Sequence, residues 1–219
     1  MSKIAHIVAI RAGSLGDLGF GISTIAGDID HVLDEGQVWI APRPHLETDF
    51  NFVQPIPYIV IRDGDRVLAY ERGQKGGDAR LFSKVSIGFG GHVDASDAVI
   101  TGDGVIDLRA TMVAACVREL EEELGIDLTH LSDEERAALC NWAGVISSDA
   151  NEVDMVHIGL VNIIDANRLP GLDIAKFEDV IEKGRWALAD GLFTDAAAGN
   201  VELESWTSLV LSHPFPIIA

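Results

Sequence analysis

The chain has 219 residues, of which 47% are hydrophobic, enough for one globular domain with a buried core. Its 16 Lys and Arg against 35 Asp and Glu give a formal net charge of −19. This charge repels nucleic-acid polymers and calls for cations between the protein and any polyphosphate ligand. No apolar run approaches the roughly 20 residues that cross a bilayer. We therefore expect neither a nucleic-acid polymer nor a membrane as a partner.

The cysteine content favours a reducing compartment. Only Cys116 and Cys140 occur, both in apolar helical patterns, so the sequence indicates neither a disulfide framework nor a zinc site. The beginning of the chain reads better as a strand than as a signal peptide. We expect a cytoplasmic protein.

The first 50 residues form an elaboration in which strands are expected at 3–10 and 37–41. Residues 13–27 between them are rich in glycine and have no clear period. The pattern then sharpens: residues 56–62 and 66–72 predict a hairpin around a Gly-containing turn. Residues 81–89 predict another strand, which ends in a glycine cluster that includes Gly90 and Gly91.

The second half of the chain alternates helices and strands. Residues 94–104 read as an inserted loop, and a long helix is expected from 108 to 124, stopped by Gly125. Ser132 and Glu135 form a capping box for a short helix. Further expected elements are strands at 141–147 and 155–164 and helices near 174–184 and 202–211. This order predicts an α/β fold, an α/β/α sandwich on a mixed sheet, as one domain over 1–219 with an elaboration at 1–50, a core at 51–170 and C-terminal helices at 171–219.

Carboxylates gather on one side of the helix expected at 108–124. At about 100° per residue, Glu119, Glu122 and Glu123 cluster nearly opposite an apolar stripe, whereas Glu121 falls outside the cluster. The stripe consists of Val113, Val117, Leu120 and Leu124. Oxygen-rich clusters of this kind suit Mg²⁺ or Mn²⁺. Taken alone, the carboxylates fit a solvated acidic face and a metal site about equally well.

The neighbouring residues favour the metal site. Residues 118–126 read Arg-Glu-Leu-Glu-Glu-Glu-Leu-Gly-Ile and match the second half of the Nudix signature: Arg-Glu, an aliphatic residue, any residue, Glu-Glu, any residue, Gly and an aliphatic residue. Gly90 and Gly91 lie upstream, where that family has its glycine-rich loop. The chain thus resembles the Nudix hydrolases over about residues 45–165, and residues 54–93 resemble an uncharacterised subgroup of predicted phosphoesterases.

The resemblance departs from the signature at one position. The family pattern has a Gly, five residues, a Glu and seven residues before the Arg. Gly104 is correctly placed, but Ala110 occupies the Glu position. In the family this Glu pairs with the arginine, here Arg118, and helps hold the signature loop and helix. Asp107 or an acid within 94–103 is the candidate replacement.

The resemblance implies metal-dependent cleavage of a pyrophosphate bond. Glu119, Glu122, Glu123 and the Gly91 carbonyl would hold Mg²⁺ or Mn²⁺, and Arg118 would belong to the same catalytic segment. Divalent ions withdraw charge from phosphoryl oxygens and activate water for attack on phosphorus. A carboxylate would accept the proton of that water. It lies on the signature helix or in a later loop, where Glu152 is the candidate, although a polar hairpin turn explains that loop equally well.

Basic residues before the glycine cluster are candidates for substrate binding, because arginine offers a planar fork suited to phosphate oxygens. Arg72 and Arg80 border the strands that lead to the cluster. A solvated hairpin and loop nevertheless explains any single one of them better. His92 could contact substrate or metal, or could pack as an ordinary loop residue, and His157 is expected to be structural. The basic set comprises Arg62, Arg66, Arg72, Lys75, Arg80 and Lys84.

Three functions remain open at this point. The leading hypothesis is hydrolysis of a nucleoside diphosphate linked to another moiety, or of a similar small phosphate compound. The alternative is a Nudix-fold binding or regulatory module whose catalysis is impaired because Ala110 replaces the signature Glu. An acidic interaction protein without a site fits least, because all three clustered glutamates are present. The family also leads us to expect a homodimer, whereas the substrate itself cannot be read from the signature.

Overall fold

The computed structural model describes residues 4–73, 83–172 and 181–213. The chain divides into two compact units, and each is described by itself. Unit 1 comprises residues 1–58, 90–118 and 142–162, and unit 2 comprises residues 59–89, 119–141 and 163–219. Three elements contribute residues to both units: β4 (Phe52–Asp63), α3 (Leu108–Leu124) and β11 (His157–Asp165).

Unit 1 is built on antiparallel strands. β1 (His6–Arg11) pairs along its length with β3 (Val38–Pro42) and, at its end, with the first residues of β4. β10 (Trp142–Ser147) pairs with β2 (Gly21–Ser23) and with β11. The strands expected near the N-terminus and at 141–147 are confirmed with slightly shifted boundaries.

The glycine-rich stretch of unit 1 holds only short elements, which explains why its sequence shows no period. η1 (Ala12–Ser14) precedes β2, and α1 (Ala26–Asp30) continues into one π-helical turn, η2 (His31–Glu35). A further short helix, α2 (Arg43–Leu46), follows β3. Buried side chains from α1 and η2 join those of β1, the first half of α3, β10 and β11 in one hydrophobic core.

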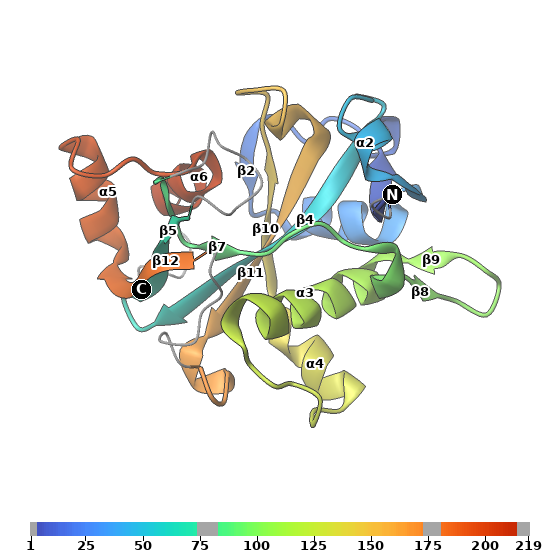
Figure 1. Ribbon diagram of the computed structural model, residues 1–219. Helices are drawn as coiled ribbons and strands as arrows, with labels where there is room; N and C mark the ends of the chain where they lie inside the picture. Colours follow the sequence, from blue (N-terminus) through green and yellow to red (C-terminus); the bar gives the residue numbers. More distant parts are fainter. Residues whose placement is uncertain (1–3, 74–82, 173–180, 214–219) are drawn as a thin grey trace. The chain divides into compact units, whose positions relative to one another are not determined.

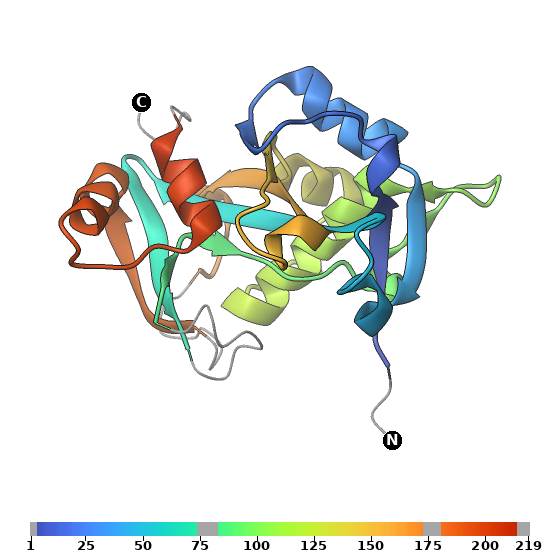
Figure 2. The ribbon, with the colours of Figure 1, turned by 90° about the horizontal axis from the view of Figure 1, so that it is seen from above.

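Residues 94–104 are not the plain loop that the sequence suggests. η4 (Ala95–Asp97) begins with a capping box in which the Asp94 and Asp97 side chains each accept a backbone N–H. β8 (Val99–Ile100) then pairs with β9 (Ile106–Asp107), and this hairpin extends from the beginning of α3 in both views (Figures 1 and 2). Strands of only two residues leave no alternating pattern in the sequence.

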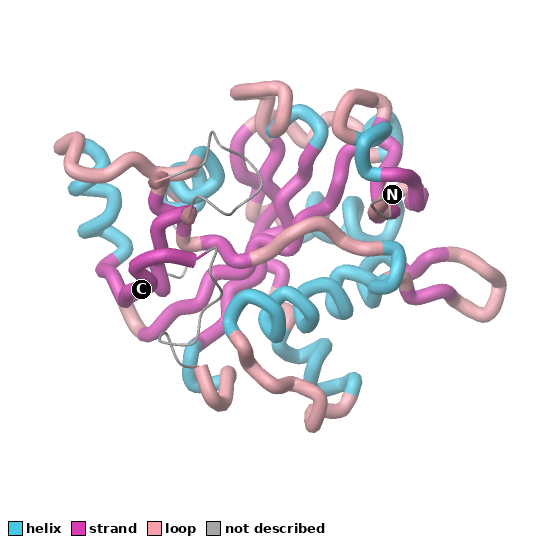
Figure 3. The backbone as a smooth tube through the Cα atoms, in the orientation of Figure 1, coloured by secondary structure: helices cyan, strands magenta, loops and turns pink. Residues whose placement is uncertain are grey.

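α3 has the bounds expected from the sequence and stands out as the long helix of Figure 3. Three residues of its predicted apolar stripe, Val117, Leu120 and Leu124, are buried, whereas Val113 is half-buried. Gly125 ends the helix with a φ of 64°, and its N–H donates to the Glu121 carbonyl at 3.1 Å. Glycine adopts this left-handed conformation at no steric cost, so the C-cap prediction is confirmed.

In unit 2, β5 (Arg66–Arg72) has several strand partners. It pairs with the end of β4, with β6 (Val85–Ser86) and with β12 (Ile181–Leu188), so the predicted hairpin is confirmed. β7 (Gly88–Phe89) pairs with β4. The strand expected at 81–89 is thus two short strands, and residues 81–82 lie outside the described residues. α4 (Asp133–Leu139) begins with the predicted capping box of Ser132 and Glu135.

The C-terminal part of unit 2 corrects one prediction. The helix expected near 174–184 is wrong from Ile181 onward, where the chain forms β12, while residues 173–180 lie outside the described residues. Pairing with β5 decides this segment, and the pairing is interrupted between Glu182 and Arg185. α5 (Ala189–Ala197) and α6 (Ser205–Ser212) lie side by side in both views (Figures 1 and 2). Among the described helices, none combines the length and apolarity that a membrane span requires.

Candidate active site

Arg118 on α3 has a buried carboxylate partner in unit 1. Its Nε lies 3.0 Å from one oxygen of Asp97, and its Nη2 lies 2.9 Å from the other. Asp97 is only 8% exposed and is fixed by η4, because its side chain also accepts the Asp94 N–H at 2.8 Å. A two-point contact of this kind fixes the plane of the guanidinium group. Asp97 therefore pairs with Arg118 in a chain that has Ala110 in place of the signature Glu.

The same arginine holds the loop that follows β7. Nη2 of Arg118 donates to the His92 carbonyl at 2.8 Å, which ties α3 to the segment after Gly91. Gly90 has a φ of 144°, and a Cβ there would lie 1.8 Å from the Pro57 carbonyl oxygen. Only glycine fits such a close backbone approach. The packing of this loop against Pro57 therefore requires glycine at position 90.

The acids of α3 beyond Arg118 belong to unit 2 and differ in their surroundings. Glu119 is 6% exposed, Glu123 is half-buried and Glu122 is exposed. Glu121 instead turns to the end of the helix, where it accepts the Leu128 N–H at 3.2 Å. Glu121 is therefore engaged at the end of the helix, and burial of Glu119 is inconsistent with a uniformly solvated face.

Glu123 lies within electrostatic reach of a buried polar cluster formed by β5, β6 and Glu204, the residue before α6. Burial raises the pKa of the Tyr70 phenol; Arg72 opposes this shift, whereas Glu123 and Glu204 reinforce it. The phenol stays protonated and donates to the Gly88 carbonyl at 2.8 Å. Glu204, only 7% exposed, accepts the Ser86 hydroxyl at 2.5 Å and contacts Arg72 at 3.4 Å. These contacts join the C-terminal helix to the strands before the glycine cluster.

The carboxylates of α3 have the donor chemistry that Mg²⁺ and Mn²⁺ prefer. Across the described residues, no three His, Cys, Asp or Glu side chains are grouped so that they alone could hold an ion. Mg²⁺ is commonly bound through one or two carboxylates together with water and substrate phosphate. Exposed Glu122 and half-buried Glu123 supply carboxylate oxygens of this kind, so the donor chemistry fits such an ion.

The basic residues before the glycine cluster have acidic partners in unit 2. Arg72 contacts Glu204 and also stacks over the Tyr70 ring, 5.8 Å from its centroid. Its guanidinium group thus has two contacts within the protein. It is also a candidate for substrate binding. Arg80 and Lys75 lie outside the described residues. The remaining ion pairs of the set are Arg62 with Asp165, Arg66 with Asp63, and Lys84 with Glu202.

His92 is paired with His157 inside unit 1. Their Nε2 atoms are 3.1 Å apart, and Nδ1 of His157 donates to the Val153 carbonyl at 2.7 Å. Burial lowers the pKa of His92 to about 3, reinforced by Arg43 and His157, and burial also lowers the pKa of His157. Both rings are neutral near pH 7. His92 therefore packs against His157 and carries no positive charge that could bind phosphate.

This pair makes unit 1 sensitive to acid. The unfolded chain takes up protons near pH 6.5, whereas folded His92 has a pKa of about 3 and folded His157 has a lowered pKa. Stability is therefore full above pH 6.5 and falls as the pH drops below it. The loss should approach about 1.4 kcal/mol per pH unit for each buried ring. We expect His92→Gln to reduce the slope of unfolding free energy between pH 7 and 5, measured by urea titration. Exposed His130→Asn is the control, and an unchanged slope in His92→Gln would contradict the assignment.

Glu152, the candidate base in the later loop, is exposed in the turn before η5 (Asp154–Val156). That turn is organised locally, because the Asn151 side chain accepts the Val153 and Asp154 N–H groups at 3.0 Å. This local bonding explains the turn without a catalytic role. Asp97 is one of the acids within 94–103 that the sequence offers as the replacement partner of Arg118, and this contact confirms that segment rather than Asp107. The sequence gives no signal for Glu204, which is also buried.

No protein-family model matches the chain. Protein YmaB of Bacillus subtilis (strain 168) is 36% identical to it over 169 residues, which cover 77% of this chain and 74% of that protein. This chain belongs to the YmaB family.

Solved structures define the fold of this YmaB-family member. Tm1382, named as a candidate Nudix hydrolase, superposes with a TM-score of 0.68 at 22% identity, covering 94% of this chain and 96% of its own. A NUDIX hydrolase from Alicyclobacillus acidocaldarius gives a TM-score of 0.50 at 16% identity, covering 76% and 91%. The chain therefore has the Nudix fold. The predicted α/β sandwich on a mixed sheet is confirmed.

Proposed function

We propose that this protein is a divalent-metal-dependent hydrolase that cleaves the pyrophosphate bond of a nucleoside diphosphate linked to another moiety, or of a similar small molecule. The observation that carries the proposal is the pairing of Arg118 with buried Asp97. It supplies the arginine of the signature helix with a carboxylate although Ala110 replaces the usual Glu. The argument for impaired catalysis is weakened accordingly.

The residues on α3 and in the loops that contact it have separate roles in this proposal. Asp97 and the His92 carbonyl fix Arg118, which anchors the loop after Gly91 against the helix. Glu119, Glu122, Glu123 and the Gly91 carbonyl are the candidate ligands. A bound Mg²⁺ or Mn²⁺ would withdraw charge from the phosphoryl oxygens and make water more acidic. A carboxylate that is not engaged by the ion would accept the proton of the attacking water.

The net charge supports a small phosphate compound as the substrate. With a net charge of −19, a small phosphate compound that arrives with its cation is a better partner than a nucleic-acid polymer. We further propose a cytoplasmic location and a homodimer.

The alternative, a Nudix-fold binding or regulatory module, makes a different prediction about the carboxylates. A module without turnover has no need for Glu119, Glu122 and Glu123 together, and their mutual repulsion costs roughly a few tenths of a kcal/mol per pair. Their presence favours the enzyme.

One panel tests the enzyme against the module. Nucleotide sugars, dinucleoside polyphosphates, nucleoside triphosphates, NADH and ADP-ribose are incubated with Mg²⁺ or Mn²⁺, and product release is measured. We expect turnover of at least one compound with metal and loss of that turnover in excess chelator. Millimolar Mg²⁺ should also raise the melting temperature, because an ion that binds the folded state stabilises it. A raised melting temperature without turnover of any compound would instead favour the binding module, and undiminished turnover in chelator would contradict the metal.

A further inference from the structure

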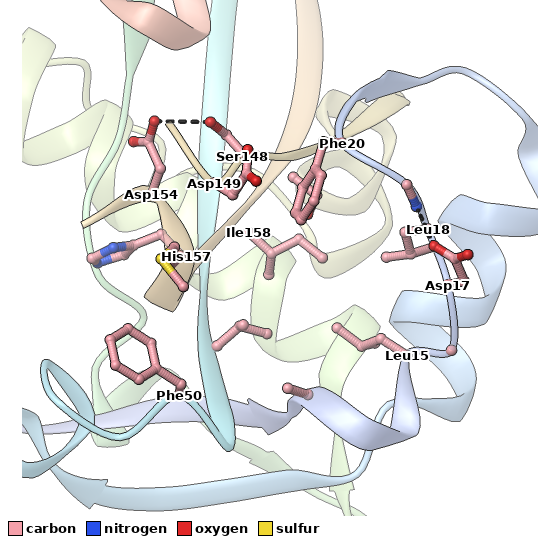
Figure 4. Close-up of a pocket in the computed structure, with 16 residues that line it drawn as sticks. Leu15, Asp17, Leu18, Phe20, Phe50, Ser148, Asp149, Asp154, His157 and Ile158 are labelled. Carbon is pink, nitrogen blue, oxygen red and sulfur yellow. Dashed lines mark hydrogen bonds between the residues drawn. The ribbon is translucent and has the colours of Figure 1, made fainter. Parts of the chain in front are cut away.

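Unit 1 contains a pocket of about 370 Å³, within the range of small-molecule sites. Neither Arg118 nor any carboxylate of α3 lines it. Its walls come from residues 12–20, the beginning of β4, the end of β10 and the turn that leads into β11 (Figure 4). The pocket therefore does not include the residues that carry the proposed hydrolysis, although His157 in its wall contacts His92 of the loop after Gly91.

The pocket combines a packed floor with exposed apolar walls. Leu15 and Ile158 belong to the hydrophobic core of unit 1 and form the floor. Phe20, Phe50 and Met155 are 73%, 53% and 44% exposed, and Figure 4 shows the two phenylalanines on opposite sides of Ile158 in that view. Large apolar side chains that gather in a concavity mark a binding site more often than scattered ones do. Aromatic rings gain most from another ring stacked on or against them.

Aspartate and serine side chains, together with His157, are the polar groups of the pocket, and the aspartates give it negative charge. Asp17, Asp149 and Asp154 line it, and the described residues around it include no Lys or Arg. One oxygen of Asp17 accepts the Gly19 N–H at 3.0 Å. Asp154 is 8% exposed and is held in place by the Ser148 hydroxyl at 2.9 Å. His157 adds no cation, because its Nδ1 donates to the Val153 carbonyl and its Nε2 faces His92.

We infer that this pocket binds a planar aromatic ring that carries N–H donors and no negative charge, such as an amino- or amidino-substituted ring. The phenylalanines supply stacking surfaces, and the aspartates accept the N–H groups. An anionic ring would bring like charges together without a cation to separate them. The inference does not depend on the proposed hydrolysis.

Benzamidine and benzoate test this inference, because they share a ring and differ in charge and donors. The full chain is titrated with each in excess chelator, and binding is followed by shifts in protein NMR signals. We expect saturable binding of benzamidine and none of benzoate at the same concentrations. Chelator keeps the measurement independent of turnover, so a failure here would leave the proposed hydrolysis untouched.

Substitutions of single phenylalanines test whether benzamidine binds in this pocket. Phe20→Ala and Phe50→Ala should each weaken benzamidine binding by about tenfold, while Phe193→Ala should leave it unchanged. Phe193 is a matched control, since it is 48% exposed on α5 in unit 2 and does not line the pocket. All three positions are exposed, so folding is preserved, and melting temperatures check this.

The charge of the pocket is tested separately. The double variant Asp17→Asn with Asp149→Asn, two exposed positions, should reduce the preference for benzamidine over benzoate by roughly fivefold. Absence of saturable benzamidine binding, equal binding of benzoate, or an equal loss in Phe193→Ala would each overturn the inference.

Discussion

Glu122→Gln and Glu123→Gln are each expected to lower turnover by about a hundredfold or more, whereas Glu121→Gln should cost less than about tenfold. An amide keeps the size of the carboxylate and removes the charge that holds a divalent ion. Glu121 has another task, because it accepts the Leu128 N–H at the end of α3. A glutamine oxygen can accept the same hydrogen bond, so this variant keeps the helix end and tests charge alone.

The three variants form a matched set on one turn of helix. Substitutions at exposed or half-buried helix positions usually change stability by no more than about 0.5 kcal/mol, so all three should stay folded, as melting temperatures would show. Glu119 is left out because it is 6% exposed, and a change there mixes folding with function. Turnover is measured on whichever compound the panel identifies. Equal losses in all three would refute the separation by helical phase, and three unchanged rates would refute the enzymatic role of this helix.

Local sequence rules account for the parts of the fold that were predicted well. α3, its Gly125 stop and the Ser132–Glu135 capping box each depend on residues within a few positions of one another, and the sequence shows those directly. The sequence predicts helix where β12 forms, because the pairing of β12 with β5 joins residues more than a hundred positions apart. Tertiary pairing outweighs local propensity in such a segment.

The candidate site was predictable only in its signature half. Residues 118–125 carry a pattern that is visible in the sequence, including the helical phase of the glutamates. Contacts between distant residues leave no such pattern: Arg72 meets Glu204 at a sequence separation of 132, and His92 meets His157 at a separation of 65. The sequence also does not show the acids that pair with Arg62 and Lys84, because Asp165 and Glu202 lie more than a hundred residues away along the chain.

Asp97→Ala should destabilise the protein by about 3 kcal/mol, because removal of one partner from a buried ion pair leaves the other charge uncompensated. The Asp97 and Arg118 side chains are 7% and 22% exposed, so solvent replaces little of the lost contact. Urea titration would measure the change. Asp103→Ala is the control, since it removes an exposed acid from the same segment and should leave the unfolding midpoint nearly unchanged. Equal midpoints for the two variants would show that the Arg118 contact contributes nothing.

A second substitution tests whether Asp97 replaces the signature Glu as the partner of Arg118. Position 110 is half-buried on α3, eight residues before Arg118, where the family signature has its arginine partner. Ala110→Glu in the otherwise unchanged chain should give no gain in stability, because Arg118 already has a carboxylate at 2.9 Å. In the Asp97→Ala background the same change should restore part of the lost stability, since the two acids then act as alternatives and their effects are not additive. Equal effects of Ala110→Glu in both backgrounds would mean that Asp97 and the signature Glu do not share a role. Partial rescue would identify Asp97 as the acid that compensates for Ala110.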